Sequence, residues 1–249
     1  MNIIVCVKRV PDSESRIQVK GDGSSIDTQG VKYVLNPYDE YAVEEALKLK
    51  EGAGGGSVTV MTLGGEEAKE TLRTALAMGA DQGVLLKGEA SVDGLGTAEK
   101  LAAAIKGREF DLVLFGKQAI DDDNLQVPAM VAELLNVPSA TVVVELQVEG
   151  NKVKAKREIE GGHEICEFET PGVIAAQKGL NEPRYASLKG IMQAKKKPLE
   201  EIDVGAAESR LEISELTPPP ERSAGEIVGQ GADAVPELVR KLREEAKAL

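Results

Sequence analysis

The sequence predicts an α/β protein with a mostly parallel sheet that carries helices on both faces. Over the first half of its 249 residues, strand-like segments alternate with helix-like segments. Hydrophobic residues make up 42% of the chain but aromatic residues only 3%, which indicates a core packed with Ala, Val and Leu. From residue 141 to 178, β-branched runs broken by glycine-containing turns indicate antiparallel hairpins that complete or flank the sheet.

The first half supplies the parallel strands and their covering helices. Strands are expected over residues 2–7, 57–63, 83–87 and 111–116. The helix after Asn36 has the clearest start, because Asn36 can cap it and Pro37 suits its first position. Asp39 and Glu40 favour the positive end of the helix dipole, and Gly52 marks the end of the helix. Further helices are expected over residues 66–78, 97–105 and 125–136.

The C-terminal part differs in style and is expected to form an extended arm. Residues 199–216 are acidic, and a run of three prolines follows at 218–220. A last helix places apolar residues on one face, which we expect to pack on another subunit, although packing on its own domain is equally open: Val235, Leu238, Val239 and Leu242. We therefore divide the chain into a nucleotide-binding domain, 1–198, which includes a loop at 176–198, and an arm with its helix, 199–249.

Charge and composition exclude several classes of function. The net charge of −12 argues against nucleic acid as a partner, because a phosphate groove needs widely spread basic residues. No apolar run approaches the ~18 residues that a membrane helix needs, so no membrane insertion is expected. A strand-like segment follows Met1 at once and the two cysteines stand far apart, so we expect no secretory leader and a reducing cytoplasm or an equivalent internal compartment. Of these, we expect the bacterial cytoplasm.

The usual parts of hydrolytic and metal-dependent sites are scarce. Cys6 and Cys166 stand far apart without metal-ligand spacing. The single histidine, His163, lies in a Glu-Gly-Gly-His-Glu word that is typical of a hairpin turn, so it is expected to be an exposed turn residue. No second histidine is present to complete a zinc site or a nucleophile and base pair.

A basic segment interrupts the acidic chain. Between residues 178 and 198 there are six basic residues against one acid, a local charge of +5. Leu188, Ile191 and Met192 stand at i, i+3 and i+4, which places an apolar ridge on one face of a short helix, as in helix-in-groove recognition. Gly190 weakens the helix prediction, and an ordinary solvated loop remains the alternative.

Three strand exits could receive a small molecule. In an open parallel sheet, ligands collect at the carboxyl ends of the strands, here residues 6–8, 63–65 and 116–124. Neither a Walker loop nor a Gly-x-Gly-x-x-Gly word follows the strands. The aspartates at 121–123 could bind a metal, but acids before a helix more often act as caps. A phosphate beside them requires that backbone donors, rather than carboxylates, face it.

Five sequence motifs, in order over nearly the whole chain, closely resemble those of the electron-transfer flavoprotein β subunit: residues 36–39, 73–81, 116–123, 157–162 and 181–188. The resemblance implies a Rossmann-like, adenine nucleotide hydrolase-like fold and a heterodimer without catalysis in this chain. An α subunit would hold most of the FAD, and this chain would hold AMP. Electrons would pass from acyl-CoA dehydrogenases of fatty acid β-oxidation to a membrane quinone reductase.

The resemblance also assigns roles to residues. Leu188 would enter a pocket on the dehydrogenase, with Tyr185, Ile191 and Met192 beside it, and Glu158 would lie near the mobile flavin domain. The AMP contacts would fall on Cys6, Asn36, Pro37, Tyr38, Asp39, Leu63, Gly116, Lys117, Gln118, Ala119, Ile120, Asp121, Asp122, Asp123, Asn124, Leu125, Gln126 and Val127.

One departure from the family pattern leaves an alternative. Where mitochondrial-type members continue with Asn-Gln-Thr-Gly, this chain has Asn-Leu-Gln-Val at 124–127, so side-chain contacts to a phosphate are not assured. The Gln-Val pair is similar to the electron-bifurcating, NADH-oxidising branch, whose β subunit binds a second FAD instead of AMP. That branch has glycine where Asp122 stands, so the sequence favours AMP. A free-standing nucleotide-hydrolysing α/β protein is a third reading, disfavoured by the lack of catalytic groups.

Overall fold

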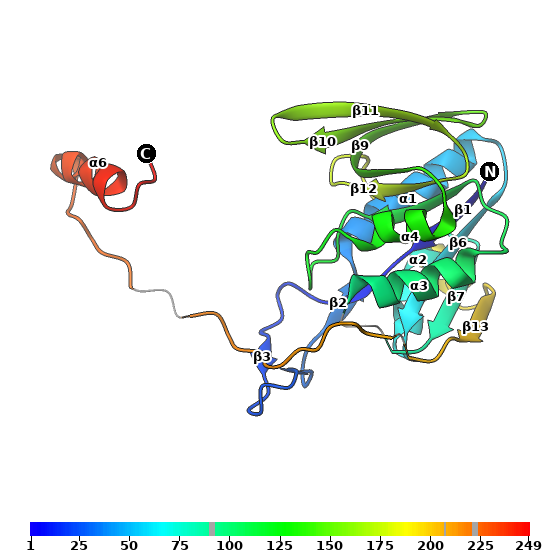
Figure 1. Cartoon of the computed structure of the whole chain (residues 1–249), viewed down its shortest axis with the longest axis horizontal. Helices are drawn as coiled ribbons and strands as arrows, with labels where there is room; N and C mark the ends of the chain where they lie inside the picture. Colours follow the sequence, from blue (N-terminus) through cyan, green and yellow to red (C-terminus); the bar gives the residue numbers. More distant parts are fainter. Residues whose placement is uncertain (90–92, 207, 221–223) are drawn as a thin grey trace.

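The computed structural model describes residues 1–89, 93–206, 208–220 and 224–249. Its body is built on a nine-stranded sheet in the order β11-β10-β9-β12-β8-β1-β6-β7-β13 (Figure 1). The strands of this sheet are β1 (Asn2–Cys6), β6 (Ser57–Gly64), β7 (Gln82–Lys87), β8 (Leu112–Gly116), β9 (Ser139–Glu149), β10 (Lys152–Ile159), β11 (Gly162–Glu169), β12 (Gly172–Ala176) and β13 (Leu199–Asp203). Across the sheet, every neighbouring pair from β9 through β12, β8, β1, β6 and β7 to β13 is parallel. The pairs β9–β10 and β10–β11 at the other edge are antiparallel. The sheet is thus mostly parallel, as predicted.

Helices cover both faces of the sheet, as predicted. The helices are α1 (Pro37–Gly52), α2 (Ala68–Met78), α3 (Gly94–Ile105), α4 (Val127–Leu135), α5 (Leu188–Ala194) and α6 (Val235–Glu244), with a 3₁₀ turn at Ala232–Ala234. Alternate side chains of β1 serve opposite faces: Ile3 and Val5 join the core under α1 and α2, whereas Ile4 and Cys6 join the core under α3 and α4. Two short ribbons, β2 (Arg9–Pro11) with β5 (Tyr33–Leu35) and β3 (Gln18–Val19) with β4 (Ile26–Asp27), connect β1 to α1.

The antiparallel hairpins expected between residues 141 and 178 are confirmed for β9, β10 and β11, but β12 differs. Strand β12 lies in the middle of the sheet, parallel to both β8 and β9. All five of its residues are buried. A strand covered on both faces shows a continuous apolar run rather than alternation, and Gly172–Ala176 has this pattern.

The arm begins later than expected. Residues 199–203 form β13, an edge strand parallel to β7, rather than part of the arm. Leu199 and Ile202 pack against opposite cores, and the acidic side chains between them pair with cations outside: Glu200 with Arg108, and Glu201 with Lys69. The acidic composition therefore reflects an edge strand, where charges also guard against edge-to-edge pairing.

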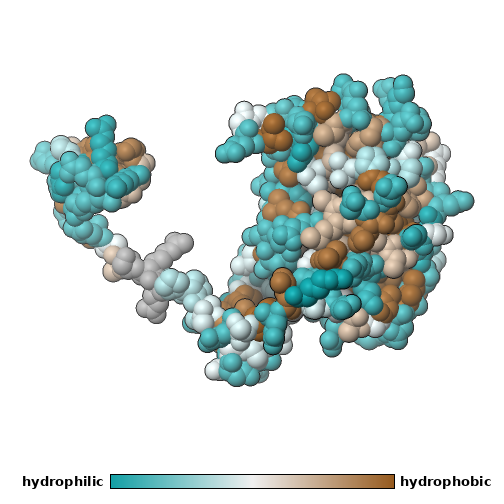
Figure 2. Space-filling view, viewed as in Figure 1, coloured by the Kyte–Doolittle hydropathy of each residue, from teal (hydrophilic) through white to brown (hydrophobic). Residues whose placement is uncertain are grey.

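Beyond β13 the arm lies against the start of α3, where the Arg210 amide donates to the Asp93 carboxylate at 2.6 Å, and the chain ends in α6, which lies away from the sheet (Figure 1). The arm touches the β3–β4 region, where the Leu216 amide donates to the Gly23 carbonyl at 2.9 Å. No described residue of α6 is buried. Apolar side chains gather on one side of α6 (Figure 2). Val235 is 52% and Leu238 43% exposed, so the described residues leave these side chains uncovered.

Candidate functional site

A cavity of about 830 Å³, including its open mouth, lies where β1, β6 and β8 end. Cys6, Leu63 and Phe115 line it from these strands, and Gly94 and Val127 line it from the first turns of α3 and α4. Its position at the carboxyl ends of parallel strands is where open α/β sheets bind ligands.

Most of the residues assigned to the nucleotide line this cavity. They are Cys6, Asn36, Asp39, Leu63, Gly116, Lys117, Gln118, Ala119, Asp122, Asn124, Leu125, Gln126 and Val127. The remaining five assigned residues are not among its lining: Pro37, Tyr38, Ile120, Asp121 and Asp123. Three strand exits that are distant in the sequence thus meet, and the 116–127 segment forms one wall.

Asn36 joins the start of α1 to the loop after β8. Its position at the N-cap is as predicted, but its side chain makes no capping hydrogen bond. Instead, its amide group donates to the Gln118 carbonyl at 2.8 Å, and its oxygen accepts from the Ile120 amide at 3.2 Å. Asn36 therefore shapes the wall of the cavity, a long-range role that helix signals do not reveal.

Asp39 does more than favour the helix dipole. Its buried carboxylate accepts from the backbone amides of Lys8 at 2.7 Å and Gly116 at 3.0 Å. Burial raises the pKa of Asp39 to about 7, although these amide donors oppose the shift. The same burial, with the nearby Asp39 charge, raises the pKa of the Cys6 thiol, so Cys6 is an apolar floor residue rather than a nucleophile.

The three aspartates of the wall are engaged by donors from the chain itself. The Lys8 ammonium contacts Asp121 at 2.8 Å and Asp122 at 3.1 Å, and the Gln118 amide group donates to Asp123. Burial lowers the pKa of Lys8, but the hydrogen bonds and charges of Asp121 and Asp122 outweigh it, and the net shift is upward. Lys8 thus neutralises part of the charge of these carboxylates, and an anionic ligand would still meet the rest.

Two helix N-termini open on the cavity. Backbone amides in the first turn of a helix have no intrahelical acceptor and carry the positive end of the dipole. Helices α3 and α4 both begin at the cavity and pack against each other. The first-turn amides that the chain leaves unbonded, which do not include the Gly96 amide capped by Asp93, can serve as donors to a phosphate group.

Sequence reasoning missed the contribution of α3. The helix was expected from residue 97, but it starts at Gly94 after an Asp93 N-cap, whose carboxylate accepts from the Gly96 amide at 2.7 Å. Asp93, Gly94, Thr97 and Leu101 all line the cavity. An aspartate before Gly-Leu-Gly-Thr was the available signal. The other lining residues that were not assigned are Val7, Lys8, Phe115 and Pro128.

No metal site accompanies this cavity within the described residues, where no group of three or more His, Cys, Asp or Glu side chains could hold an ion. His163 lies at the second position of β11 and is exposed, close to the predicted turn. Nor is any helix in the described part of the chain both long and apolar enough to span a membrane.

The basic segment forms a short helix, as predicted. Helix α5 starts after Ser187, whose hydroxyl accepts from the Gly190 amide at 3.0 Å. Leu188 is 83% exposed, Met192 71% and Ile191 46%, and the preceding Tyr185 is 99% exposed. The predicted apolar ridge is therefore present, and no described residue covers it.

Glu158 lies elsewhere, on the outer hairpin. It is exposed near the end of β10 opposite His163, and it accepts a hydrogen bond from Gln177 at 2.8 Å. Gln177 directly follows β12 and precedes the basic segment, residues 178–198. The structure thus places Glu158 at the solvent-facing edge of the body, separate from the cavity.

Together, the fold and its cavity define an α/β protein with a binding site at the strand ends and a projecting apolar ridge. The family described as the electron transfer flavoprotein domain matches residues 24–207. The electron transfer flavoprotein subunit β of Bradyrhizobium diazoefficiens is 45% identical over 256 residues, and that of Bacillus subtilis 44% over 260, each covering the whole of both chains. The human subunit β is 42% identical over 98% of this chain and 97% of its own. The chain belongs to the electron transfer flavoprotein family, as a β subunit, an electron carrier.

Proposed function

We propose that this chain is the β subunit of a heterodimeric electron transfer flavoprotein that binds AMP and docks acyl-CoA dehydrogenase-type flavoenzymes. An α subunit holds most of the FAD, which supplies the redox chemistry and passes electrons to a quinone reductase. The β subunit carries no catalytic group of its own and works in the bacterial cytoplasm. The observation that carries this proposal is the uncovered ridge of α5, where Leu188 is 83% exposed.

The cavity fits a mononucleotide. Apolar side chains from three strands, Cys6, Leu63 and Phe115, can contact a base and ribose, while the amides that begin α3 and α4 are suited to a phosphate. Lys8 already pairs with Asp121 and Asp122, so the wall of the cavity is less acidic than the sequence suggests. The nucleotide would connect strand ends and helix starts, a structural role.

Asp122 favours AMP over a second FAD. Its side chain lines the cavity and is held by Lys8 at 3.1 Å, at the position where the bifurcating branch has glycine. A side chain at this position occupies space that a diphosphate approaching the backbone would need. The Gln126-Val127 pair, in contrast, is similar to the bifurcating branch. The bifurcating β subunit is therefore the second candidate.

The ridge fits an apolar pocket on a partner enzyme. Leu188 and Met192 project from α5, and the lysines at 178, 189, 195 and 196 form no ion pair in the described residues, which leaves them free for an acidic rim. The α subunit is proposed to cover the unpartnered face of α6 and the arm. The exposed Glu158 would face the mobile flavin domain.

Rapid mixing of the purified heterodimer with a substrate-reduced acyl-CoA dehydrogenase tests this function. We expect the flavin absorbance of the heterodimer to bleach at a rate that saturates with dehydrogenase concentration, and no bleaching with NADH alone. Reduction by NADH without a dehydrogenase would instead support the bifurcating β subunit. A chain that is a stable monomer and turns over ATP would contradict both.

A further inference from the structure

The docking ridge, Leu188, Ile191 and Met192 of α5, belongs to a segment whose own side chains fix it to the body. Helix α5 has only seven residues, and isolated helices of this length are unstable in water. Its orientation must therefore come from tertiary contacts. We call residues 178–198 the docking segment. Two of its basic residues, Arg184 and Lys197, supply these contacts and point toward the body.

Arg184 is clamped to α1. Its guanidinium contacts both oxygens of Glu44, at 2.7 and 2.9 Å, and reaches Glu51 at 2.7 Å. The backbone amide of Arg184 also donates to Glu44 at 3.1 Å, so one buried carboxylate fixes both the side chain and the main chain. These hydrogen bonds raise the pKa of Arg184, and such bidentate pairs fix geometry as well as charge. Asn181 adds hydrogen bonds to the Tyr41 carbonyl, about one turn before Glu44, and to Glu45, the residue after it.

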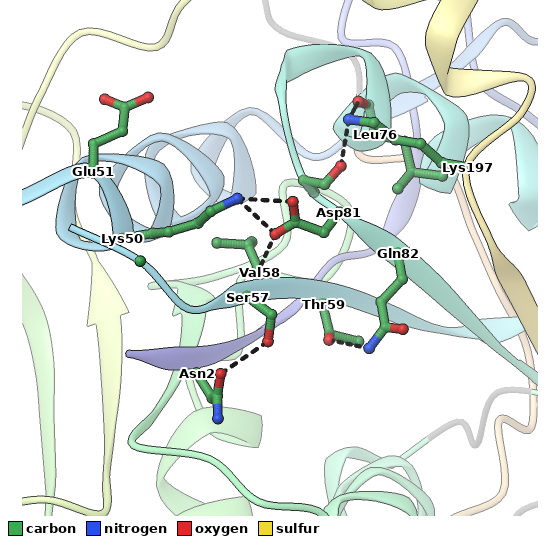
Figure 3. Close-up of polar contacts among 12 residues, drawn as sticks. Asn2, Lys50, Glu51, Ser57, Val58, Thr59, Leu76, Asp81, Gln82 and Lys197 are labelled. Atoms are coloured by element: carbon green, nitrogen blue, oxygen red, sulfur yellow. Dashed lines mark hydrogen bonds and ion pairs between the residues drawn. The ribbon is translucent and has the colours of Figure 1, made fainter. Parts of the chain in front are cut away.

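Lys197 and Arg73 fix the other end of the segment to α2. The Lys197 ammonium donates to the Leu76 and Ala80 carbonyls, at 2.9 and 2.6 Å, where α2 ends (Figure 3). Arg73 donates in return to the Ala194 and Lys197 carbonyls. A cation at a helix C-terminus satisfies carbonyls that have no intrahelical donor.

The two anchoring helices are themselves joined. The Lys50 ammonium, in the last turn of α1, contacts both oxygens of Asp81, at 2.7 and 2.8 Å. Asp81 lies between α2 and β7 and also accepts from the Val58 amide (Figure 3). The ends of α1 and α2 are therefore linked to each other, and the segment that carries α5 is fixed to both.

Close packing completes the arrangement. A Cβ at Gly190 would lie closer to the Ala77 carbonyl oxygen than real contacts allow, so α5 approaches α2 with no spare space. In contrast, Leu188, Tyr185 and Met192 are exposed and make no hydrogen bond to the body within the described residues. The base of the segment is held by these contacts, whereas its apolar tip is open to solvent.

We propose that Arg184 is a positioning residue: through Glu44 it holds α5 in a single orientation on α1 and α2, so that Leu188, Ile191 and Met192 are presented ready to bind. The partner pocket then receives a preformed helix rather than a loop that must be ordered on binding. Ordering a flexible side chain or loop lowers affinity, so a loss of this clamp weakens docking without a change at the tip. The inference rests on the proposed docking function.

The test uses the double variant Arg184→Ala/Glu44→Gln in the full heterodimer, which removes the clamp without leaving a buried charge behind. We expect amides of residues 188–194 to exchange hydrogen at least about tenfold faster, because local protection reports local opening. The KM for the heterodimer in a dehydrogenase assay should rise about tenfold with kcat, nucleotide content and flavin content unchanged. Arg184→Lys keeps the charge but not the bidentate geometry, so its exchange rate and its KM should lie between those of the wild type and the double variant.

Arg108→Ala is the matched control. Arg108, which follows α3, makes a similar ion pair with Glu200 of the edge strand β13, at 3.0 Å. Its loss should leave both the exchange of 188–194 and the KM at wild-type values. Unchanged exchange in the double variant would overturn the proposal, and so would a KM increase accompanied by loss of nucleotide, which indicates a general structural role.

Leu188→Ala separates this inference from the docking function. If Leu188→Ala raises the KM but the double variant does not, the clamp is refuted and docking stands. If Leu188→Ala leaves the KM unchanged, docking by α5 fails. Faster exchange of 188–194 in the double variant would then show only that Arg184 orders the helix, and the positioning role in recognition would be overturned with it.

Discussion

Replacement of Leu188 by alanine gives the sharpest test of the docking ridge. The change removes three carbon atoms from a side chain that is 83% exposed. Burial of a methylene group contributes about 0.8 kcal/mol. If the partner pocket encloses the exposed part of the side chain, the loss is about 2 kcal/mol, which corresponds to a roughly 30-fold weaker interaction.

The assay is steady-state reduction of the heterodimer by a dehydrogenase, with the heterodimer as the varied substrate. We expect the KM to rise by about 30-fold while kcat, thermal stability and bound nucleotide stay constant, because an exposed side chain adds little to the folded state. Leu134→Ala, which shortens a 41% exposed leucine on α4, is the control and should leave the KM unchanged. A KM within about twofold of wild type for Leu188→Ala, or equal effects of both variants, would refute the reasoning.

Three further outcomes follow from the cavity and the charges. The raised pKa of Asp39, about 7, makes the native state bind more protons than the unfolded chain above about pH 4, so the free energy of unfolding should fall toward pH 7 by at most about 1.4 kcal/mol per unit. Urea titrations of Asp39→Asn should show a flatter pH dependence, and an unchanged slope would contradict this. Gly116→Ala would place a Cβ 2.5 Å from the Asp39 carboxylate and 2.6 Å from the Tyr38 backbone, so it should cost about 1–3 kcal/mol and reduce nucleotide content, whereas Gly52→Ala, with open space, should do neither. Added salt should raise the KM several-fold between about 50 and 300 mM, because exposed lysines steer docking, and a salt-independent KM would argue against that role.

Local signals predicted the elements well but not the contacts between them. The Pro37 start of α1, the hairpins after β9 and the helix at α5 follow from residue type and spacing, and the structure confirms them. Residues 199–203 were misread because their acids indicated solvent, whereas in the structure Leu199 and Ile202 pack against opposite cores from an edge strand. A strand on an edge satisfies both patterns, and composition alone does not separate them.

The site shows the same limit. The strand ends were predicted as its position, and the structure brings them together. The partners of Asn36 and Asp39 were not predictable, because they are backbone groups near residues 8 and 116–120 that only the folded sheet brings close. Likewise, the local charge of +5 between residues 178 and 198 did not show that Arg184 and Lys197 contact α1 and α2. Charge counts do not show which side a long side chain takes.

The nucleotide content of the purified heterodimer tests the central claim most directly. The protein is denatured, and the released nucleotides are separated and quantified against the protein concentration. We predict one FAD and one AMP for each heterodimer. Two FAD and no AMP would contradict the proposal and assign this chain to the electron-bifurcating branch.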